Sequence, residues 1–324
     1  METHEVIIIG AGPCGLGAAR RLASLGVRDV VVLEREQEAG GIPRHCGHTG
    51  FGWNSHYRLW TGPRFASELR QSVQGLDVRT DTSVLKLEPN GRMHVRDQHG
   101  VAVMQARRVL IATGTRETPR SARLVGGTRP SGVMNTGALQ QHVYLHGFAP
   151  FKRPVIVGSE WVAFSALLTC RHLGIAPVAM LEENTLLSAA SGHSLVDSVL
   201  GWGLRSVGRA VFGTQVLTQT RLIAIRGQAQ VNAVEVEHGG VHRHIDCDGV
   251  VFCGQFRPEN ALFDEALGDA PLRCEHRAPR MDTPFRCSDP AYFAAGNVLA
   301  PLKNAGNCWR QGASAAQHML ASLQ

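Results

Sequence analysis

The chain has 324 residues, of which 44% are hydrophobic and 19% charged, and its formal net charge is +6. This composition excludes a disordered chain, and the length predicts two domains at roughly 150 residues each, or one large α/β unit. Because the arginines are spread along the chain without a basic run, the charge favours anionic cofactors or partners and not nucleic acid.

The eight cysteines include no C-x-x-C pair, which favours a reduced, cytoplasmic chain. The first residues lack the basic start of a secretory signal, and no stretch reaches the ~18–20 apolar residues that span a bilayer. We therefore expect a soluble protein without a transmembrane segment.

The start of the chain has the pattern of a dinucleotide-binding turn. The apolar run at residues 6–9 is typical of a parallel strand covered on both faces, and Gly10, Gly12 and Gly15 follow it directly. In this motif the first glycine permits the tight turn, the second lets a pyrophosphate approach the backbone, and the third lets a helix pack on the strand.

The residues that follow complete this first unit. A helix is predicted from about Gly15 to residue 25, and a strand at residues 29–33 leads to Glu34. An acid at this position is placed to bond a ribose hydroxyl. A glycine-rich turn without a ligand is the alternative, but strand, glycines, helix, strand and acid occur in the expected order.

A second copy of this pattern begins about 148 residues later. The interval from Gly158 to Glu182 is 24 residues, equal to the interval between the first glycine and the acid of the first copy. In the second copy, Glu160 replaces the second glycine and Ala163 replaces the third. We expect Glu160 to occupy the anion site at the helix N-terminus and to repel a nicotinamide dinucleotide. The alternative is a nucleotide that still binds beside a shifted loop.

Further segments resemble the FAD-dependent pyridine nucleotide-disulfide oxidoreductase superfamily, in the two-domain form similar to thioredoxin reductase. They are residues 109–114, residues 250–254, residues 292–297, where Asn297 replaces an acidic residue near the ribityl chain, and residues 310–312, beside the flavin ring. The resemblance implies FAD as cofactor, bound by Gly10, Gly12, Pro13, Gly15, Glu34, Arg35, Gly41, Ile42, Val84, Ala112, Thr113, Gly114, Gly296, Asn297 and Arg310.

The resemblance implies an α/β protein of two Rossmann-like, three-layer domains. The FAD-binding domain is expected to be discontinuous, comprising residues 1–118 and 253–324. The inserted domain, residues 119–252, is expected to be NAD(P)-binding-like with a degenerate nucleotide motif. Within the first domain, residues 94–96 and 101–103 predict an antiparallel hairpin.

Disulfide reduction is not expected, because the cysteines provide no redox dithiol beside the flavin. Residues 40–52 resemble instead the flavoprotein α subunits of multicomponent amino-acid and opine dehydrogenases, such as opine oxidase, hydroxyproline dehydrogenase and hydrogen cyanide synthase. This implies an oxidoreductase subunit that oxidises a small-molecule amine and passes electrons to flavin or iron–sulfur partner subunits. The alternatives are a stand-alone NAD(P)H-dependent flavin reductase using Cys46 and a non-catalytic flavin-binding scaffold.

The candidate catalytic residues are His45, Cys46 and His48, in a loop that this fold brings over the flavin. Cys46 is a candidate nucleophile or peroxide sensor if its neighbours lower its pKa, and otherwise a buried thiol without a role. Either histidine is a candidate base, or a charge that balances the reduced flavin. Their spacing is unlike a zinc motif, so we expect no metal.

Two apolar segments have open interpretations. Trp53, Tyr57 and Trp60 are expected to pack around the candidate catalytic loop, with a substrate wall as the alternative. Residues 185–211 predict a helix with a long apolar face, which either caps the second domain or docks a partner.

Overall fold

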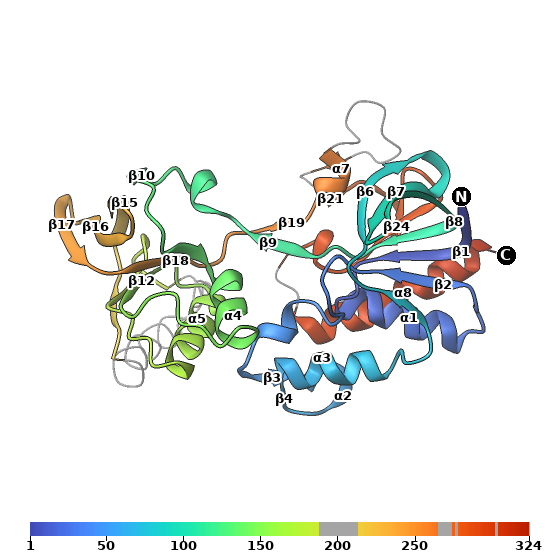
Figure 1. Cartoon of the computed structure of the whole chain (residues 1–324), viewed down its shortest axis with the longest axis horizontal. Helices are drawn as coiled ribbons and strands as arrows, with labels where there is room; N and C mark the ends of the chain where they lie inside the picture. The colour runs from blue at the N-terminus through green and yellow to red at the C-terminus, as the bar shows by residue number, and fades with distance from the viewer. Residues whose placement is uncertain (188–212, 265–273, 276–277, 302–303, 324) are drawn as a thin grey trace. The chain divides into compact units, whose positions relative to one another are not determined.

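The computed structural model describes residues 1–187, 213–264, 274–275, 278–301 and 304–323. The chain divides into two compact units (Figure 1). Unit 1 comprises Met1–Arg44, Thr49–Arg116 and Phe256–Gln324, and unit 2 comprises His45–His48 and Glu117–Gln255. The predicted apolar helix at residues 185–211 lies, from residue 188 on, outside the described residues.

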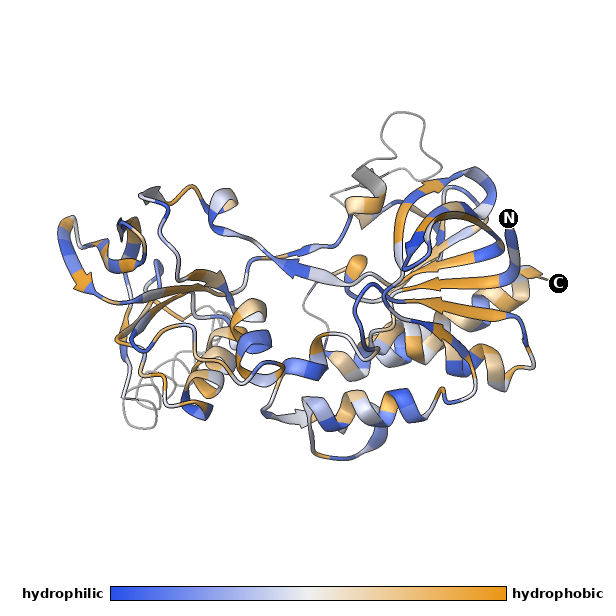
Figure 2. Cartoon of the chain, in the orientation of Figure 1, coloured by the Kyte–Doolittle hydropathy of each residue, from blue (hydrophilic) through white to orange (hydrophobic). Residues whose placement is uncertain are grey.

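The centre of unit 1 is a run of five parallel strands in the order β5-β2-β1-β8-β24. They are β1 (Glu2–Ile9), β2 (Val30–Leu33), β5 (Asp77–Arg79), β8 (Gly100–Ile111) and β24 (Tyr292–Ala294). Apolar, mostly β-branched residues fill β1 and β2 where these strands pair, as a sheet buried on both faces requires (Figure 2). Counted along the chain, this is the 3-2-1-4-5 order of a nucleotide-binding sheet.

Three helices cover one face of this sheet: α1 (Pro13–Ser24), α3 (Gly62–Gln71) and α8 (Ala305–Leu323) (Figure 1). Val6 and Ile8 of β1 pack into this helical layer, while Ile7 and Ile9 point to the other side, following the period of two in a strand.

The other face is covered by β6 (Ser83–Glu88) and β7 (Arg92–Asp97). β7 pairs with β6 and with β8, in both cases antiparallel. His94 pairs with Val103, so the predicted hairpin is confirmed. The remaining elements of unit 1 are η1 (Ile42–His45), β3 (Thr49–Phe51), α2 (Trp53–His56), β4 (Trp60–Thr61), η2 (Pro89–Gly91), β9 (Thr115–Glu117), β19 (Phe256–Pro258), α7 (Ala261–Asp264), β20 (Cys274–Glu275), β21 (Ala278–Pro279), β22 (Met281–Thr283), β23 (Arg286–Cys287) and η6 (Gly296–Val298), of which η1 and β9 extend into unit 2.

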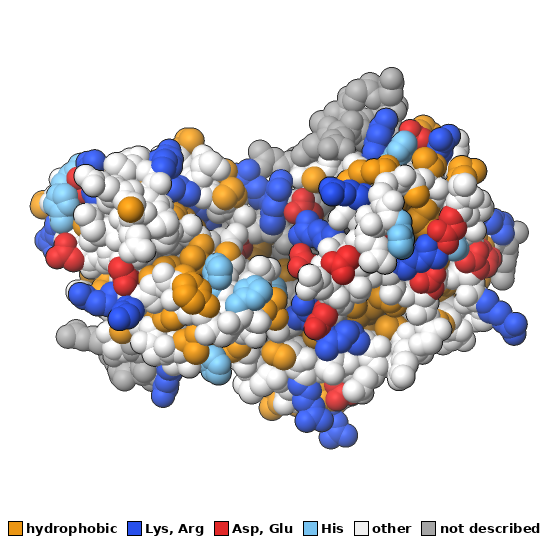
Figure 3. Space-filling view, in the orientation of Figure 1, with side chains coloured by type: hydrophobic (Ala, Val, Ile, Leu, Met, Phe, Trp, Pro, Cys, Tyr) orange, Lys and Arg blue, Asp and Glu red, His pale blue; other side chains and the backbone are white. Residues whose placement is uncertain are grey.

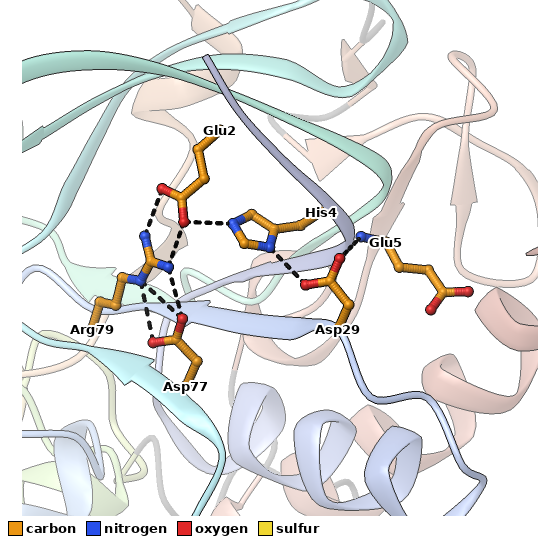
Figure 4. Close-up of polar contacts among 6 residues, drawn as sticks. All are labelled: Glu2, His4, Glu5, Asp29, Asp77 and Arg79. Atoms are coloured by element: carbon orange, nitrogen blue, oxygen red, sulfur yellow. Dashed lines mark hydrogen bonds and ion pairs between the residues drawn. The ribbon is translucent and has the colours of Figure 1, made fainter.

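A cluster of charged side chains ties β1 to β2 and β5 (Figure 4). Arg79 Nη2 lies 2.6 Å from Glu2 Oε1 and 2.7 Å from Asp77 Oδ2. His4 lies between two carboxylates, with Nε2 2.9 Å from Glu2 Oε1 and Nδ1 2.7 Å from Asp29 Oδ1. The hydrogen bond from Arg79 holds the pKa of Glu2 at about 2, against an ordinary 4.5.

Unit 2 repeats the architecture of unit 1. Its five-stranded sheet is parallel throughout and has the order β11-β18-β12-β13-β14. The strands are β11 (Val133–Asn135), β12 (Pro154–Val157), β13 (Ala179–Leu181), β14 (Gln215–Leu217) and β18 (Gly249–Phe252). The positions of β12, β13, β14 and β18 match those of β1, β2, β5 and β8, which confirms the repeat inferred from the glycine-to-acid interval.

The sheet of unit 2 also lies between two layers. One is formed by α4 (Thr136–Tyr144) and α5 (Trp161–His172), with Asn135 capping α4 by accepting a hydrogen bond from Ala138 N–H at 2.9 Å. The other layer is the sheet of β10 (Gly126–Gly127), β15 (Thr220–Gly227), β16 (Val231–His238) and β17 (Val241–Asp246), and η3 (Arg120–Arg123) precedes it.

Candidate functional site

The predicted cofactor residues of unit 1 collect at one edge of its sheet. Because β1, β2, β8 and β24 are parallel, the segments that follow them, residues 10–12, 34–36, 112–114 and 295–297, leave the sheet at the same edge. This edge is where open parallel sheets bind their ligands.

Two glycines shape the turn after β1. Gly10 has φ +102°, and a Cβ there would lie 2.7 Å from the carbonyl oxygen of Ala112. A Cβ on Gly15 would lie 1.9 Å from the carbonyl oxygen of Gly10. Any larger side chain at either position would displace the backbone, so these glycines set the shape of the loop, as the sequence predicts.

Gly12 differs because it faces open space. It is the N-cap of α1, Pro13 follows it, and the nearest atom to a Cβ placed there is the Cα of Gly41, at 3.9 Å. Gly41 has φ +63° and also carries no side chain. No acidic residue occupies the first turn of α1. The N-terminus of α1 can therefore receive a pyrophosphate on its free N–H groups, between two bare stretches of backbone.

Glu34 is buried and organises this loop. Its Oε2 accepts a hydrogen bond from Ala11 N–H at 2.8 Å, and its Oε1 accepts one from Glu36 N–H at 3.0 Å. Thr82 N–H donates to the carbonyl of Glu34 at 2.8 Å, which brings the start of β6, with Val84, beside the acid. Each carboxylate oxygen keeps a second lone pair that can accept a ribose hydroxyl. Glu34 thus fixes the glycine turn in addition to its predicted role.

Two further segments lie along the same edge. The carbonyl of Gly114 accepts a hydrogen bond from Glu259 N–H at 2.9 Å, and Thr113 Oγ1 donates to the carbonyl of Glu259 at 2.8 Å. Gln311 Oε1 accepts from Gly296 N–H at 3.0 Å, which joins the start of α8 to the loop that contains Asn297. These hydrogen bonds position the loops that are predicted to meet the flavin.

The other predicted cofactor residues are less enclosed. Arg310 is exposed and donates to Asn307 Oδ1 at 2.6 Å. The side chain of Arg35 is 66% exposed, and Ile42 is 47% exposed. Val84 packs against the apolar cluster beneath β6. Their contacts with the cofactor remain predictions.

The equivalent edge of unit 2 uses the same devices. Gly158 has φ +105°, and a Cβ there would lie 2.9 Å from the carbonyl oxygen of Cys253. Glu182 is buried, and it accepts hydrogen bonds from the Ser159 hydroxyl and from Asn184 N–H, the latter at 2.9 Å. The backbone frame of a nucleotide site is therefore retained.

Glu160 stands where Gly12 stands in unit 1. It is the N-cap of α5, but its side chain makes no capping hydrogen bond. Instead its Oε1 accepts from Gln255 N–H at 2.8 Å, and its carboxylate lies 2.3 Å from the point where a Cβ on Gly254 would be. The sequence predicts that this carboxylate lies on its own helix. In the structure it spans from the turn after β12 to the loop after β18, because that loop presents an amide to it.

Sequence reasoning missed the residues that hold the loop after β18. Glu117 is buried, and it accepts hydrogen bonds from Gly254 N–H at 3.0 Å and from Gly137 N–H at 2.8 Å. Burial raises the pKa of Glu117. Arg123 Nη2 donates to the carbonyls of Cys253 and Gly254 at 3.0 and 2.8 Å. No local sequence signal predicts the contacts of Glu117 and Arg123 with residues 253–254, which join segments 130–137 residues apart.

Cys46 belongs to unit 2 and is buried there. Its Sγ donates to Gln140 Oε1 at 3.4 Å, and Gln140 Nε2 donates to Ser165 Oγ at 2.8 Å. Burial, reinforced by the charge of Glu117, raises the pKa of Cys46 to about 12. This is the opposite of the lowered pKa that an activated nucleophile or a peroxide sensor needs.

The two candidate histidines lie in the same segment of unit 2. His45 is buried and His48 is half-buried. Between them, Gly47 packs so tightly on α4 that a Cβ would lie 2.1 Å from the ring of Tyr144. Among the described residues, no group of three His, Cys, Asp or Glu side chains is arranged to hold a metal ion.

The aromatic residues that follow do not all pack as expected. Trp60 packs against the helical core of unit 1. Trp53 is 57% exposed and Tyr57 is 84% exposed, so the packing prediction is wrong for these two. Trp53 begins α2 and Tyr57 follows it, and the half-buried ring of His56, the last residue of this helix, packs on Trp60 and Trp309 instead.

Comparison with known families places the chain. Residues 4–316 match the family model described as pyridine nucleotide-disulphide oxidoreductase. The chain belongs to this family. It is an FAD-dependent oxidoreductase, which confirms the resemblance, the fold class and the flavin cofactor inferred from the sequence. No helix within the described residues has both the length and the apolar character needed to cross a bilayer.

Two curated relatives are components of oxidases. The A subunit of opine oxidase from Rhizobium meliloti (strain 1021) is 29% identical over 344 residues, which cover 100% of this chain and 72% of the relative. The alpha subunit of sarcosine oxidase from the same strain is 24% identical over 340 residues, which cover 98% of this chain but only 30% of the relative.

Solved structures share the fold. Thioredoxin reductase of T. acidophilum superposes with a TM-score of 0.77 and 19% identity, covering 99% of both chains. L-proline dehydrogenase of P. horikoshii superposes with a TM-score of 0.73 and 19% identity, covering 98% of this chain and 55% of that one.

Proposed function

We propose that this chain is the FAD-bearing subunit of a multicomponent dehydrogenase. Its substrate is an amino acid, an imino acid or an opine-like secondary amine, and it passes electrons to partner subunits. The names of the curated relatives, which are subunits of opine oxidase and of sarcosine oxidase, support both the amine substrate and the association with other subunits. The single observation that carries the proposal is the contrast between Gly12 and Glu160 at equivalent positions.

Unit 1 would hold the cofactor through its own backbone. The N-terminus of α1 at Gly12 and Pro13 would bind the pyrophosphate, and Glu34 would accept the ribose hydroxyls while it keeps the turn in place. The hydrogen bond from Gly296 N–H to Gln311 would hold the loop beside the ribityl chain. The bound flavin supplies a hydride acceptor, and the protein supplies position and electrostatics.

Unit 2 would not supply electrons from a pyridine nucleotide. At the position where Gly12 leaves room for a pyrophosphate, unit 2 has Glu160, whose carboxylate is held by Gln255 N–H in the adjoining loop and brings a negative charge. Two phosphate charges beside this carboxylate would be repelled, and the amide of Gln255 is already bonded. Electrons therefore enter from the amine.

The test is anaerobic reduction of the purified flavoprotein. We expect an amine of the sarcosine, proline or opine class to bleach the flavin, while NADH and NADPH leave it oxidised. Rapid bleaching by NADH or NADPH would favour the stand-alone reductase and contradict the proposal.

A matched variant locates the cause. Glu160→Gly, compared with Glu160→Gln, removes the carboxylate and its volume, and we expect it to gain dinucleotide binding, measured by calorimetry with NADH. If Glu160→Gly binds NADH no better than the unchanged chain does, the carboxylate is not what prevents dinucleotide binding in unit 2.

A further inference from the structure

Three segments of unit 1 contain no aspartate or glutamate: residues 6–28, 49–67 and 290–324. They include α1, the hairpin of β3 and β4 with α2 between its strands, and α8. Exposed arginines occur in each of them, at Arg20, Arg58, Arg64 and Arg310. The three segments also meet in space, so their excess of positive charge is concentrated in one region of the surface.

The meeting point is an aromatic cluster around His56. The ring of His56 lies 5.4 Å from that of Trp60, 5.8 Å from Phe65 and 5.6 Å from Trp309. Burial lowers the pKa of His56, which favours the neutral imidazole in this packing. On the same helix, Asn54 contacts the start of α8 so closely that a Cβ on Gly306 would lie 3.1 Å from its Cβ. The inner face of α2 is thus fixed to unit 1.

The outer face of the same loop is apolar and exposed. Trp53 is 57% exposed, Tyr57 84% and Leu59 68%. Because the inner side of this loop is anchored, the tryptophan, the tyrosine and the leucine on its outer side stay exposed to solvent, which does not stabilise a monomer. Exposed apolar patches with polar rims mark interaction sites.

Arginines surround this apolar centre. The guanidinium carbon of Arg64 lies 5.9 Å from the ring of Trp60, and that of Arg20 lies 5.9 Å from the ring of Trp309. Arg58 lies between Tyr57 and Leu59 in the chain and is exposed. In the space-filling view, Lys and Arg side chains gather on the lower edge, over the region of α2 and α3 (Figure 3). We call Trp53, Tyr57, Arg58, Leu59 and Arg64 the Trp53 patch.

We propose that the Trp53 patch docks an acidic protein surface, that of the subunit which accepts electrons from this chain. This rests on the proposed function. The patch adjoins the start of α8 at Trp309, two residues before Gln311, whose amide holds Gly296 at the cofactor edge. A protein bound here would lie close to that edge, and its acidic residues would match the exposed arginines, of which Arg64 also lies 3.6 Å from Glu68 Oε1.

The composition of the patch favours a protein over a nucleic acid or a membrane. Trp, Tyr and Arg are the side chains that dominate binding energy at protein interfaces. A nucleic-acid surface needs many phosphate contacts along a track, and the patch has two arginines around an apolar centre.

The first experiment uses the complex that co-purifies with the tagged chain from its native source. A photo-reactive p-benzoylphenylalanine replaces Tyr57 or, as the control, Val101, which is 63% exposed on β8. We expect position 57 to cross-link to an acidic subunit that co-purifies, and position 101 to give no cross-link. A cross-link from position 101 alone would refute docking at the Trp53 patch and leave the proposed function standing. A chain that purifies without partners would refute both the docking proposal and the proposed function.

The second experiment tests the charges. Arg58→Glu with Arg64→Glu is compared with Arg28→Glu with Arg96→Glu, which makes the same charge change at exposed residues elsewhere in unit 1. We expect the patch variant to bind the electron-accepting partner at least ~10-fold more weakly and the control to bind normally, with flavin reduction by the amine unchanged in both. Tyr57→Ser with Leu59→Ser should weaken binding without a charge change.

Equal binding by the patch and control variants would refute the proposal. Binding of the unchanged chain to RNA or to phosphatidylserine vesicles, lost in the patch variant while the partner protein still binds, would assign the patch to those ligands instead.

Discussion

At equivalent positions of the two units, Gly12 leaves a helix N-terminus open, whereas Glu160 brings a carboxylate that accepts a hydrogen bond from Gln255 N–H in the loop after β18. The two acids that end the second strands, Glu34 and Glu182, serve both loops in the same way, by accepting hydrogen bonds from the turn. The units therefore share a scaffold and differ in the side chains of the turn, where Glu160 and Ala163 replace two of the three glycines.

Gly12→Glu should place in unit 1 the acidic side chain that Glu160 provides at the equivalent position of unit 2. A Cβ at this position meets no atom within 3.9 Å, so the variant should fold, but its carboxylate would repel the pyrophosphate. We expect at least ~100-fold weaker FAD binding, a loss of about 3 kcal/mol, measured by fluorescence titration of the apoprotein. Gly12→Ala is the matched control for backbone effects. If a complex assembled with Gly12→Glu kept full activity, the chain would be a non-catalytic scaffold.

Cys46 should be chemically inert in the folded protein. With its pKa at about 12, its thiolate fraction at pH 7.5 is roughly a thousandth or less of that of an ordinary cysteine. Iodoacetamide should modify Cys46 only after unfolding, as measured by mass spectrometry. The flavin of the Cys46→Ser variant should be reduced at the same rate as that of the unchanged chain. Fast labelling in the native state would restore Cys46 as a candidate nucleophile.

The Glu2–Arg79 pair should make stability depend on acid pH. Because the pKa of Glu2 is lowered to about 2 from 4.5, its contribution is complete above pH 4.5 and is lost as the pH falls toward 2. The Glu2 side chain is 45% exposed, so we expect a contribution of at most ~1 kcal/mol. Urea unfolding of Glu2→Gln and of the unchanged chain should differ at pH 7, and the difference should shrink below pH 4.5 and vanish only near pH 2. A constant difference across this range would contradict the assignment.

Sequence reasoning reached the glycines and acids because their roles are local. Gly10, Gly15 and Glu34 act within one strand–turn–helix segment, where spacing determines geometry. It could not give the direction of the Glu160 carboxylate, because the amide that binds it belongs to Gln255, 95 residues later in the chain.

At the scale of elements, α1 and α8 approach closely because each helix places a glycine against the backbone of the other. A Cβ on Gly312 would lie 1.9 Å from the carbonyl oxygen of Cys14, and a Cβ on Gly17 would lie 2.4 Å from that of Trp309. This contact holds α8 against the helix whose N-terminus forms the candidate phosphate site.

Gly312→Ala should therefore loosen the flavin site from a distance. The added methyl group must push the two helices apart, at a cost of about 1–3 kcal/mol of unfolding free energy, with weaker FAD binding as a second effect. Gln317→Ala, on the exposed face of α8, is the control. Thermal unfolding with and without FAD measures both effects, and an unchanged melting temperature would show that the helices can separate freely.

The strands were predictable because buried parallel strands are runs of β-branched residues, as in β1 and β2. The short helix α2 was not predictable in this way. It has four residues, and its orientation is set by His56 contacting Trp309, which lies far along the chain. Local sequence therefore suggested packing for Trp53 and Tyr57, while the tertiary contact turned the half-buried His56 toward unit 1 instead.

At the scale of the molecule, unit 1 is assembled from separate segments whose ends are held together. Thr115 Oγ1 donates to the carbonyl of Arg257 at 2.6 Å, and Glu259 N–H donates to the carbonyl of Gly114 at 2.9 Å. β9 and β19 pair as a two-stranded sheet at the same point. The two connections to unit 2 therefore leave unit 1 side by side.

Replacing residues 117–255 with an Asn-Gly turn should leave unit 1 able to fold and bind FAD, because such a turn closes paired antiparallel ends without strain. Flavin absorbance of the purified protein measures the outcome, with the same excision carrying Gly12→Glu as the negative control. A colourless or aggregated product would mean that unit 1 depends on unit 2 for its folding.

The segment His45–His48 belongs to unit 2 although it is encoded between two parts of unit 1. During synthesis it leaves the ribosome roughly 90 residues before α4, the helix that Gly47 packs against. Recombination that exchanged residues 117–255 for those of a relative would leave this tetrapeptide behind, facing a surface with which it never evolved. Grafts of unit 2 between family members should therefore succeed only when these four residues travel with the insert.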